Sequence, residues 1–215
     1  MKPYQERFFE LALAKNNLRF GSFTLKSGRV SPYFFNAGGF DDGPSLAGLA
    51  NCYADAIIDS GISFDMLFGP SYKGIPLAAA TAIALHQAHA RPVPYAYNRK
   101  EAKDHGEGGV IVGAPLRGRV LVIDDVISAG TSVRESMDLI LDAGAEAAGV
   151  AIALDREERG AGEQSAAQEV SAQFGVPVVA IAGLAELIDY LATRAGGDID
   201  IEAIRRYRQE YGTIR

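Results

Sequence analysis

The chain has 215 residues, 48% of them hydrophobic and 22% charged, and a formal net charge of −6 at pH 7. These values fit one globular domain with a modest appendage. The acidic charge argues against a general nucleic-acid binder, which would carry a basic face. No apolar run approaches the roughly 20 residues of a membrane helix, and the N-terminus lacks the apolar stretch of a signal peptide. We therefore expect a cytoplasmic protein with no membrane or nucleic-acid partner.

The N-terminal part of the chain, up to residue 42, predicts a small α+β unit. Residues 4–15 place apolar side chains on one side of a helix. Residues 18–37 alternate apolar with small or polar side chains around a turn at 27–29. This pattern predicts two short antiparallel strands that follow the helix.

From residue 43 onward, helix and strand patterns alternate. A helix is expected to open at Gly43 and to end at Gly61. The later strands are predicted at 64–68, 93–97, 110–112, 120–123, 149–154 and 176–181. The later helices are predicted at 75–87, 132–143, 164–174, 184–194 and 199–211. This order predicts an α/β fold with a mostly parallel central sheet and helices on both faces.

The most informative segment is 120–132, Val-Leu-Val-Ile-Asp-Asp-Val-Ile-Ser-Ala-Gly-Thr-Ser. Four apolar residues predict a buried strand, and two acids, a turn of small residues and a helix start follow it. Ligands of an open parallel sheet bind outside the carboxyl ends of its strands, where this turn would lie. Ala129 and Gly130 would let the backbone approach an anion, and free amides at the helix start can bind phosphate.

The polar side chains of this segment suit a phosphorylated sugar. Asp124 and Asp125 would repel the phosphate, but they suit sugar hydroxyl groups or a magnesium ion held mostly by the ligand's own oxygens. Ser128, Thr131 and Ser132 add hydroxyl donors. The simpler alternative is an N-capped helix after a strand, with acids that face water. The P-loop pattern is absent from the segment, which disfavours a nucleotide triphosphatase.

Segment 120–132 resembles the ribose-phosphate-binding motif of the type I phosphoribosyltransferases. Five further segments resemble the orotate-specific branch of that family. They are Phe-Thr-Leu-Lys-Ser-Gly-Arg at 23–29, Ser-Pro-Tyr-Phe-Phe-Asn at 31–36, Gly-Pro-Ser-Tyr-Lys-Gly-Ile-Pro at 69–76, Asn-Arg-Lys-Glu-Ala-Lys-Asp-His-Gly-Glu-Gly at 98–108 and Leu-Asp-Arg at 154–156. One departure is Ser128, where threonine is expected; serine keeps the hydroxyl and loses a methyl contact.

The resemblance covers nearly the whole chain and implies a Rossmann-like core with a small N-terminal hood. It implies transfer of ribose 5-phosphate from 5-phosphoribosyl 1-pyrophosphate (PRPP) to orotate, giving orotidine 5′-monophosphate and pyrophosphate in pyrimidine (UMP) synthesis. Magnesium is the implied cofactor, held mainly by PRPP oxygens; the sequence leaves open whether Asp124 and Asp125 touch it directly or through water. We divide the chain into a hood at 1–42 that contributes to the orotate site, a core at 43–183, and C-terminal helices at 184–215 that pack on the core.

The same resemblance assigns the site residues. Those implied in PRPP binding are Lys26, Tyr72, Lys73, Arg99, Lys100, Lys103, His105, Asp124, Asp125, Val126, Ile127, Ser128, Ala129, Gly130, Thr131 and Ser132. Those implied in orotate binding are Lys26, Phe34, Phe35, Ser128 and Arg156. Lys103, His105, Asp124 and Asp125 are the implied catalytic residues. The fork of Arg156 could pair bidentately with the carboxylate of orotate. Taken by itself, the loop 69–74 with Lys73 would be a plain connection; because it follows a buried strand, we expect it at the same sheet edge as segment 124–132, which favours binding of the pyrophosphate. Without the resemblance, Arg156 would be assigned to the surface.

Residues 98–109 carry balanced charges and, taken alone, predict a solvated surface loop. The resemblance implies instead a mobile lid that carries Lys103 and His105 over the pyrophosphate on closure. It also implies that part of this lid reaches the site of the neighbouring subunit. The active unit would then be a two-fold homodimer with shared active sites.

Two alternatives stay open at this point. The chain could be a phosphoribosyltransferase for another base, although an uncharged purine would give Arg156 and Lys26 nothing specific to bind. It could also be a non-enzymatic regulator that senses PRPP and binds nucleic acid. Such a regulator should carry a DNA-binding domain or a basic face, and the sequence indicates neither.

Overall fold

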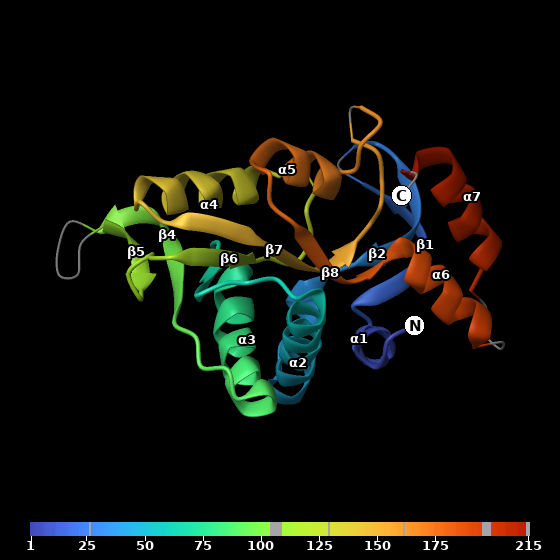
Figure 1. Ribbon diagram of the computed structural model, residues 1–215. Helices are drawn as coiled ribbons and strands as arrows, with labels where there is room; N and C mark the ends of the chain where they lie inside the picture. Colours follow the sequence, from blue (N-terminus) through green and yellow to red (C-terminus); the bar gives the residue numbers. More distant parts are fainter. Residues whose placement is uncertain (26, 104–108, 129, 161, 195–198, 214–215) are drawn as a thin grey trace.

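The computed structural model describes residues 1–25, 27–103, 109–128, 130–160, 162–194 and 199–213 (Figure 1). Among the described helices, none is both long and apolar enough to cross a membrane. A six-stranded sheet forms the centre, in the order β5-β4-β3-β6-β7-β8. The strands are β3 (Met66–Gly69), β4 (Tyr95–Lys103), β5 (Gly109–Gly113), β6 (Arg119–Ile123), β7 (Glu146–Asp155) and β8 (Val178–Gly183). Every neighbouring pair is parallel except β4 with β5. The expected mostly parallel α/β fold is confirmed.

Helices cover both faces of this sheet (Figure 1). Helices α2 (Gly43–Ser60) and α3 (Gly74–His89) lie on one face, and α4 (Thr131–Asp142) and α5 (Ala166–Phe174) lie on the other. Successive side chains of a strand point to opposite faces. In β6, Leu121 and Ile123 pack into the core on the α2–α3 face. Val120 and Val122 pack into the core under α4. The unbroken apolar run of this strand is therefore explained by burial on both faces.

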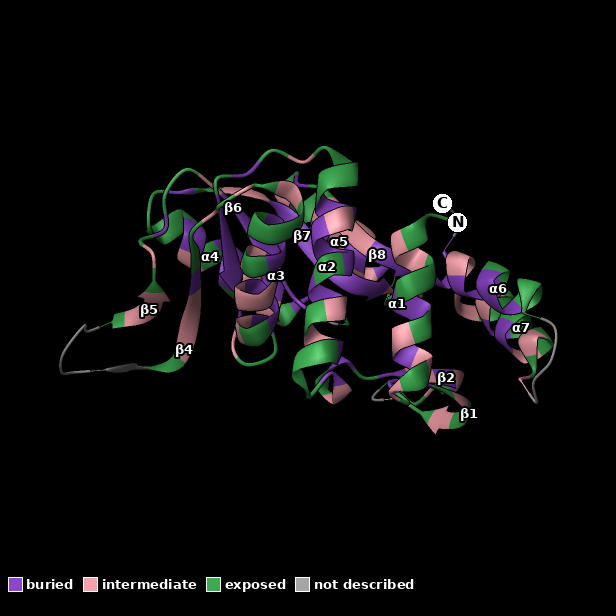
Figure 2. Ribbon diagram, turned by 90° about the horizontal axis from the view of Figure 1, so that it is seen from below, coloured by how far each residue is buried: buried purple, intermediate pink, exposed green. Residues whose placement is uncertain are grey.

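The N-terminal hood consists of α1 (Pro3–Ala14), β1 (Leu18–Thr24), β2 (Val30–Phe35) and a short 3-10 turn at Ala37–Gly39. Strands β1 and β2 are antiparallel, as expected. Seen from below, α1, α2 and α3 run beside one another, with many exposed residues on their outer sides (Figure 2). The C-terminal helices are α6 (Leu184–Thr193) and α7 (Ile201–Tyr211). Helix α6 contacts α1 and β8, and α7 contacts β2, so these helices meet the hood as well as the core.

The structure differs from the sequence prediction in the first half of the polar segment 98–109. Strand β4 does not end near residue 97 but continues to Lys103 and pairs with β5 in an antiparallel hairpin at the sheet edge. The pairing of β4 with β5 is irregular between Asn98 and Lys103, and its backbone hydrogen bonds do not require apolar side chains. At an edge, both faces can stay in contact with water, so polar residues are tolerated there. Residues 104–108 lie outside the described part of the chain.

Two glycines allow α3 to begin directly against the end of the sheet. A Cβ atom on Gly74 would lie 2.5 Å from Cδ of Pro70 and 2.8 Å from the carbonyl oxygen of Ile123. A Cβ atom on Gly69 would lie 2.2 Å from the carbonyl oxygen of Gly74. Any larger residue at either position would push the loop 69–74 away from the end of β6.

We predict that Gly74→Ala lowers the free energy of unfolding by about 1–3 kcal/mol, because backbone atoms must move to admit the methyl group. Urea denaturation followed by circular dichroism measures this change. The matched control is Gly43→Ala, since a Cβ atom on Gly43 meets nothing within 4 Å. We expect the control to stay within about 0.5 kcal/mol of the parent protein or to be slightly more stable. Equal stability of the two variants would contradict the close approach.

Candidate active site

The turn after β6 begins with two buried acids. Asp124 and Asp125 are 7% and 8% exposed. The carboxylate of Asp124 accepts hydrogen bonds from the Asp125 backbone N–H (2.9 Å) and from the Ser132 hydroxyl (2.7 Å). Burial raises the pKa of Asp124 to about 6; the Ser132 hydrogen bond opposes this shift, and the neighbouring charge of Asp125 adds to it. The Ser132 hydroxyl, expected to face the phosphate, donates here to the acid.

Asp125 links the turn to the loop after β3. Its Oδ2 lies 2.6 Å from Nζ of Lys73, and its Oδ1 accepts the backbone N–H of Val126 at 2.9 Å. The loop 69–74 therefore lies at the same sheet edge as segment 124–132, as its position after a buried strand predicts. Among the described residues, no group of three or more His, Cys, Asp or Glu side chains could hold a metal ion.

The small-residue turn leads directly into α4. Gly130 is buried and has φ 68°, a left-handed conformation that glycine adopts without strain. Helix α4 starts at Thr131 with no side-chain cap, so backbone amides of its first turn are available to an anion. Ser128 and Thr131 are exposed. Ala129 lies outside the described residues.

A cavity of about 550 Å³ lies between the hood and the core, beside this turn. The hood contributes residues of the β1–β2 hairpin, and the core contributes two segments. The lining residues are Thr24, Leu25, Ser27, Arg29, Phe34, Phe35, Val126, Ile127, Ser128, Asp155, Arg156, Glu157, Glu158, Arg159, Gly160, Ser165 and Ala166. The structure thus brings together four of the five residues assigned to orotate; the fifth, Lys26, lies outside the described part of the chain.

Phe34 and Phe35 both line this cavity, but neighbouring side chains of a strand point to opposite faces. The ring of Phe35 packs in the core against Phe8 and Phe40. The ring of Phe34 is half-buried and lies 5.6 Å from that of Phe23. Phe34 is therefore the ring that remains available to a ligand.

The remaining residues assigned to PRPP surround the loop 69–74. The Ser71 backbone N–H donates to Oδ1 of Asn98 at 2.9 Å, which ties this loop to β4. Tyr72 is 67% exposed, and the amino group of Lys100 lies 4.9 Å from the centre of its ring. Arg99 is half-buried. His105 lies outside the described residues, and Lys103 is described only as the last backbone position of β4.

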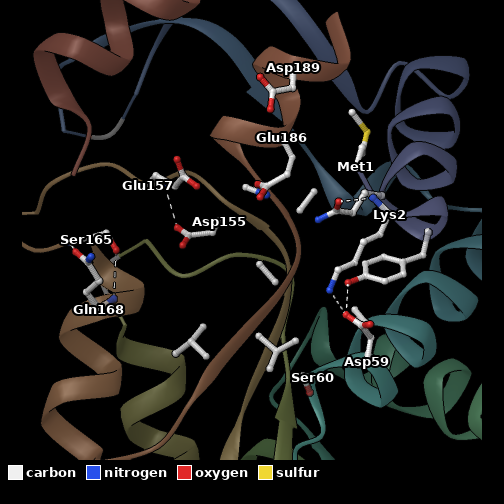
Figure 3. A pocket seen from close by; sticks show the side chains of 18 of the residues that line it. Met1, Lys2, Asp59, Ser60, Asp155, Glu157, Ser165, Gln168, Glu186 and Asp189 are labelled. Carbon is white, nitrogen blue, oxygen red and sulfur yellow. Dashed lines mark hydrogen bonds and ion pairs between the residues drawn. The ribbon is translucent and has the colours of Figure 1, made fainter. Parts of the chain in front are cut away.

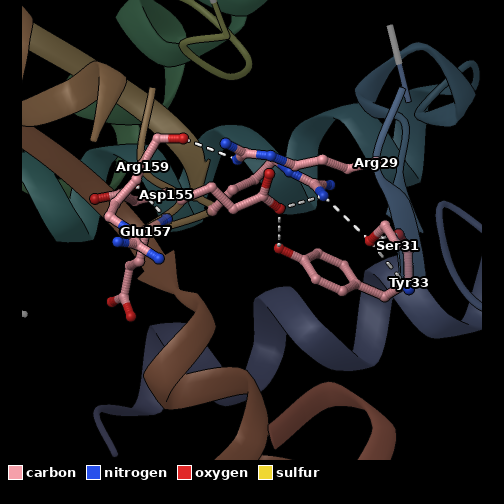
Figure 4. A network of polar contacts seen from close by, with 8 residues as sticks. Arg29, Ser31, Tyr33, Asp155, Glu157 and Arg159 are labelled. Atoms are coloured by element: carbon pink, nitrogen blue, oxygen red, sulfur yellow. Dashed lines mark hydrogen bonds and ion pairs between the residues drawn. The ribbon is translucent and has the colours of Figure 1, made fainter. Parts of the chain in front are cut away.

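Sequence reasoning missed a polar network that joins Arg29, Ser31 and Tyr33 of the hood to residues 155–159 (Figure 4). Nη2 of Arg156 donates to Oε1 of Glu158 at 2.5 Å and to Oγ of Ser31 at 3.2 Å. The guanidinium lies 4.4 Å from the ring centre of Tyr33. Ser31 and Tyr33 belong to one of the motif segments, so that signal was present, but nothing in the sequence pattern linked them to Arg156.

A second cavity, of about 700 Å³, lies along β8 (Figure 3). The acids among its lining residues are Asp59, Asp155, Glu157, Glu186 and Asp189. None of the residues of segment 124–132 lines it. An acidic lining would repel a phosphorylated or carboxylated ligand. We therefore place the active site at the first cavity and the adjoining turn.

Comparison with known proteins agrees with this geometry. A family model described as "Phosphoribosyl transferase domain" matches residues 38–181. The chain is 61% identical to the orotate phosphoribosyltransferase of Thioalkalivibrio sulfidiphilus and 60% identical to that of Pseudomonas aeruginosa, over 99% of this chain and 100% of each relative. It belongs to the orotate phosphoribosyltransferase family. The crystal structure of the Francisella tularensis orotate phosphoribosyltransferase, 43% identical, superposes with a TM-score of 0.86 over 96% of this chain and 99% of that one.

Membership of this family makes the chain a pentosyltransferase and resolves the two alternatives left open by the sequence. The matching relatives are named for orotate rather than for another base, and they are named as enzymes rather than as regulators. The match spans the hood, the core and the C-terminal helices, so it does not rest on the phosphate-binding turn alone.

The raised pKa of Asp124 predicts a pH-dependent stability. This carboxyl titrates near 3.8 in the unfolded chain and at about 6 in the folded one. The folded state therefore binds the extra proton between these values, and stability falls as the pH rises through this window. We predict that the free energy of unfolding of the parent protein falls by roughly 1–3 kcal/mol between pH 4 and 6.5, and that the isosteric Asp124→Asn variant lacks this fall. Urea unfolding of both proteins across this range measures it; identical pH profiles would contradict the assignment.

Proposed function

We propose that this protein transfers ribose 5-phosphate from PRPP to orotate, with the donor on the turn after β6 and orotate in the cavity beneath the hood. The observation that carries the proposal is that residues 126–128 belong to both places: they follow the paired acids and also line the cavity. A ribose bound on this turn would therefore present its anomeric carbon toward the base.

On the donor side, the protein's task is to position the ribose and to stabilise the charge of the departing pyrophosphate. The free amides at the start of α4 would bind the 5-phosphate, as helix N-termini bind anions. Asp124 and Asp125 would accept hydrogen bonds from the ribose hydroxyl groups. Lys73 is 52% exposed and would donate to the pyrophosphate from its place beside Asp125.

The two acids fit magnesium as carboxylate partners of an ion held mainly by PRPP oxygens. Each oxygen of Asp124 and of Asp125 accepts one hydrogen bond from a protein donor and keeps a second lone pair. Magnesium usually keeps several waters and binds substrate phosphates together with one or two carboxylates. These residues would hold the ion through water or through the ribose hydroxyls, and the ion would neutralise the pyrophosphate when bound.

On the acceptor side, Arg156 would bind the carboxylate of orotate, and Phe34 would contact the flat pyrimidine ring. The carboxylate distinguishes orotate from uracil and from the purines. A guanidinium that is 17% exposed interacts strongly with such a charge, because little water competes. Uracil, adenine and hypoxanthine would leave Arg156 without a ligand.

We also propose that the active unit is a dimer in which the lid of one chain completes the active site of the other. The β4–β5 hairpin projects from the edge of the sheet (Figure 1). It would carry Lys103 and His105 to the active site of a second copy. An apolar groove between α2 and α3 is a suitable contact for that copy, because it includes Ile83, which is 57% exposed.

We predict turnover with orotate and none with uracil, adenine or hypoxanthine. Arg156→Lys keeps the charge but loses the planar donor set, so the KM for orotate should rise about 10- to 100-fold, with little change in the KM for PRPP. The control is Arg119→Lys, a half-buried arginine paired with Asp65 outside the cavity. Steady-state kinetics with each substrate varied measures both constants. An unchanged KM for orotate in Arg156→Lys would remove this residue from the site.

The shared-site arrangement predicts complementation between two inactive variants. Lys103→Ala removes the lid function, and Asp125→Asn disables the ribose site. In an equal mixture, half of the dimers are hybrids and each hybrid has one intact site, so about a quarter of the parent activity should return. Differently tagged chains show whether hybrids have formed. Hybrid dimers without activity would contradict a lid that acts across the subunit boundary.

A further inference from the structure

The hydrogen bonds of Arg156 leave only part of its guanidinium free for a ligand. A guanidinium carries five N–H groups, two of them on Nη2. Both Nη2 hydrogens are engaged, one by Glu158 at 2.5 Å and the other by Ser31 at 3.2 Å. Within the described residues, neither Nε nor Nη1 donates a hydrogen bond of good geometry; the Tyr207 hydroxyl lies near the guanidinium without such a bond. Both edges through which an arginine grips a carboxylate with two nitrogens include Nη2. While these two hydrogen bonds persist, Arg156 cannot bind a ligand carboxylate with two nitrogens, contrary to the expectation from the sequence.

Glu158 is itself fixed before any ligand arrives. Its side chain is 14% exposed, and the hydroxyl of the fully buried Tyr33 donates to Oε1 at 3.4 Å. Its backbone forms a β-bridge with Gly212. On either side of it, the Arg159 N–H donates to the Tyr211 carbonyl and the Thr213 N–H donates to the Glu157 carbonyl, each at 2.8 Å. The C-terminal segment thus holds the residues that flank Arg156.

A ligand carboxylate would gain little by displacing Glu158 from Arg156. A carboxylate that loses its cation in a buried site becomes an uncompensated charge, which is strongly unfavourable. The charges around the cavity also give no general attraction for an anion. Among its described lining residues, three arginines (Arg29, Arg156 and Arg159) face three acids (Asp155, Glu157 and Glu158). Recognition of orotate must then depend on where the donors point, rather than on net charge.

We propose that Glu158 is a positioning residue for substrate recognition: by holding Nη2 of Arg156, it fixes the guanidinium so that one of the remaining donors, on Nε or Nη1, binds the carboxylate of orotate. The proposal rests on the function proposed above. Glu158 would thereby influence which base is bound without touching the base itself.

The test compares Glu158→Ala with Glu158→Gln. Alanine removes the acceptor for Nη2, so the KM for orotate should rise about tenfold or more, while the KM for PRPP stays within about twofold. Glutamine keeps an oxygen at the same position and should restore the KM for orotate to within about threefold of the parent value. The matched control is Asp55→Asn, a half-buried acid that binds Arg7 and His89 away from the cavity and should change neither constant. Circular dichroism confirms that each variant is folded.

A double-mutant cycle separates positioning from a merely structural role. If Glu158 acts through Arg156, then Glu158→Ala should not raise the KM for orotate further in an Arg156→Ala background. Additive effects would overturn the proposal. So would equal rises in both KM values, or a fall in the KM for orotate, which would show that Glu158 competes with the substrate.

The result for Arg156→Ala distinguishes a failure of the proposed orotate site from a failure of the role proposed for Glu158. If this variant binds orotate as well as the parent does, the orotate site proposed above is wrong. If it loses orotate affinity while Glu158→Ala does not, the site stands and only the positioning role of Glu158 is wrong. Isothermal titration of orotate into the folded variants supplies the affinities independently of turnover.

Discussion

The arrangement of the active site depends on the contacts of Asp125. Its carboxylate binds Lys73 from the loop after β3, and its backbone carbonyl accepts the N–H of Ala153 in β7 at 2.9 Å. One residue thereby fixes the carboxyl ends of three neighbouring strands relative to one another. The approach is possible because Gly74 brings the start of α3 against Ile123, the last residue of β6. The groups that would bind the donor are thus held in place before it arrives, as positional and electrostatic catalysis requires.

This arrangement has an energetic cost at Asp124. Burial raises the pKa of this carboxyl to about 6, so its ionised form is disfavoured by the fold itself. The cost is limited by the hydrogen bonds that the carboxylate accepts from the Ser132 hydroxyl and from the Asp125 backbone N–H. The Tyr53 hydroxyl holds the backbone of this residue by donating to its carbonyl at 2.6 Å. A buried carboxyl with a shifted pKa and its own hydrogen-bond donors is characteristic of functional sites, where selection acts on chemistry as well as on stability.

The sequence predicted the sheet, its helices and the turn at 124–132 because each depends on residues close together in the chain. The turn at 124–132 combines a buried strand, acids and a helix start in one continuous segment. Two features could not be predicted in this way. The strand through residues 98–103 is held by backbone pairing at an edge, so its polar side chains carry no strand signal. The network of Arg156 joins Ser31 and Tyr33, 125 and 123 positions earlier in the chain, and only the folded structure brings them together.

This difference in predictability follows from how the two substrates would be recognised in the proposed function. The ribose-phosphate end would be bound mainly by backbone amides and by acids adjacent to them, so one short segment contains most of what it needs. The base end would need one guanidinium held at a fixed angle, in a cavity whose described charges cancel. The hood supplies Tyr33 and Ser31, the core supplies Arg156 and Glu158, and the C-terminal segment holds the backbone around them. In this proposal, selection of the base is a property of the whole chain, and changes far from the cavity, in α7 or in the residues that follow it, would alter it through the position of Arg156.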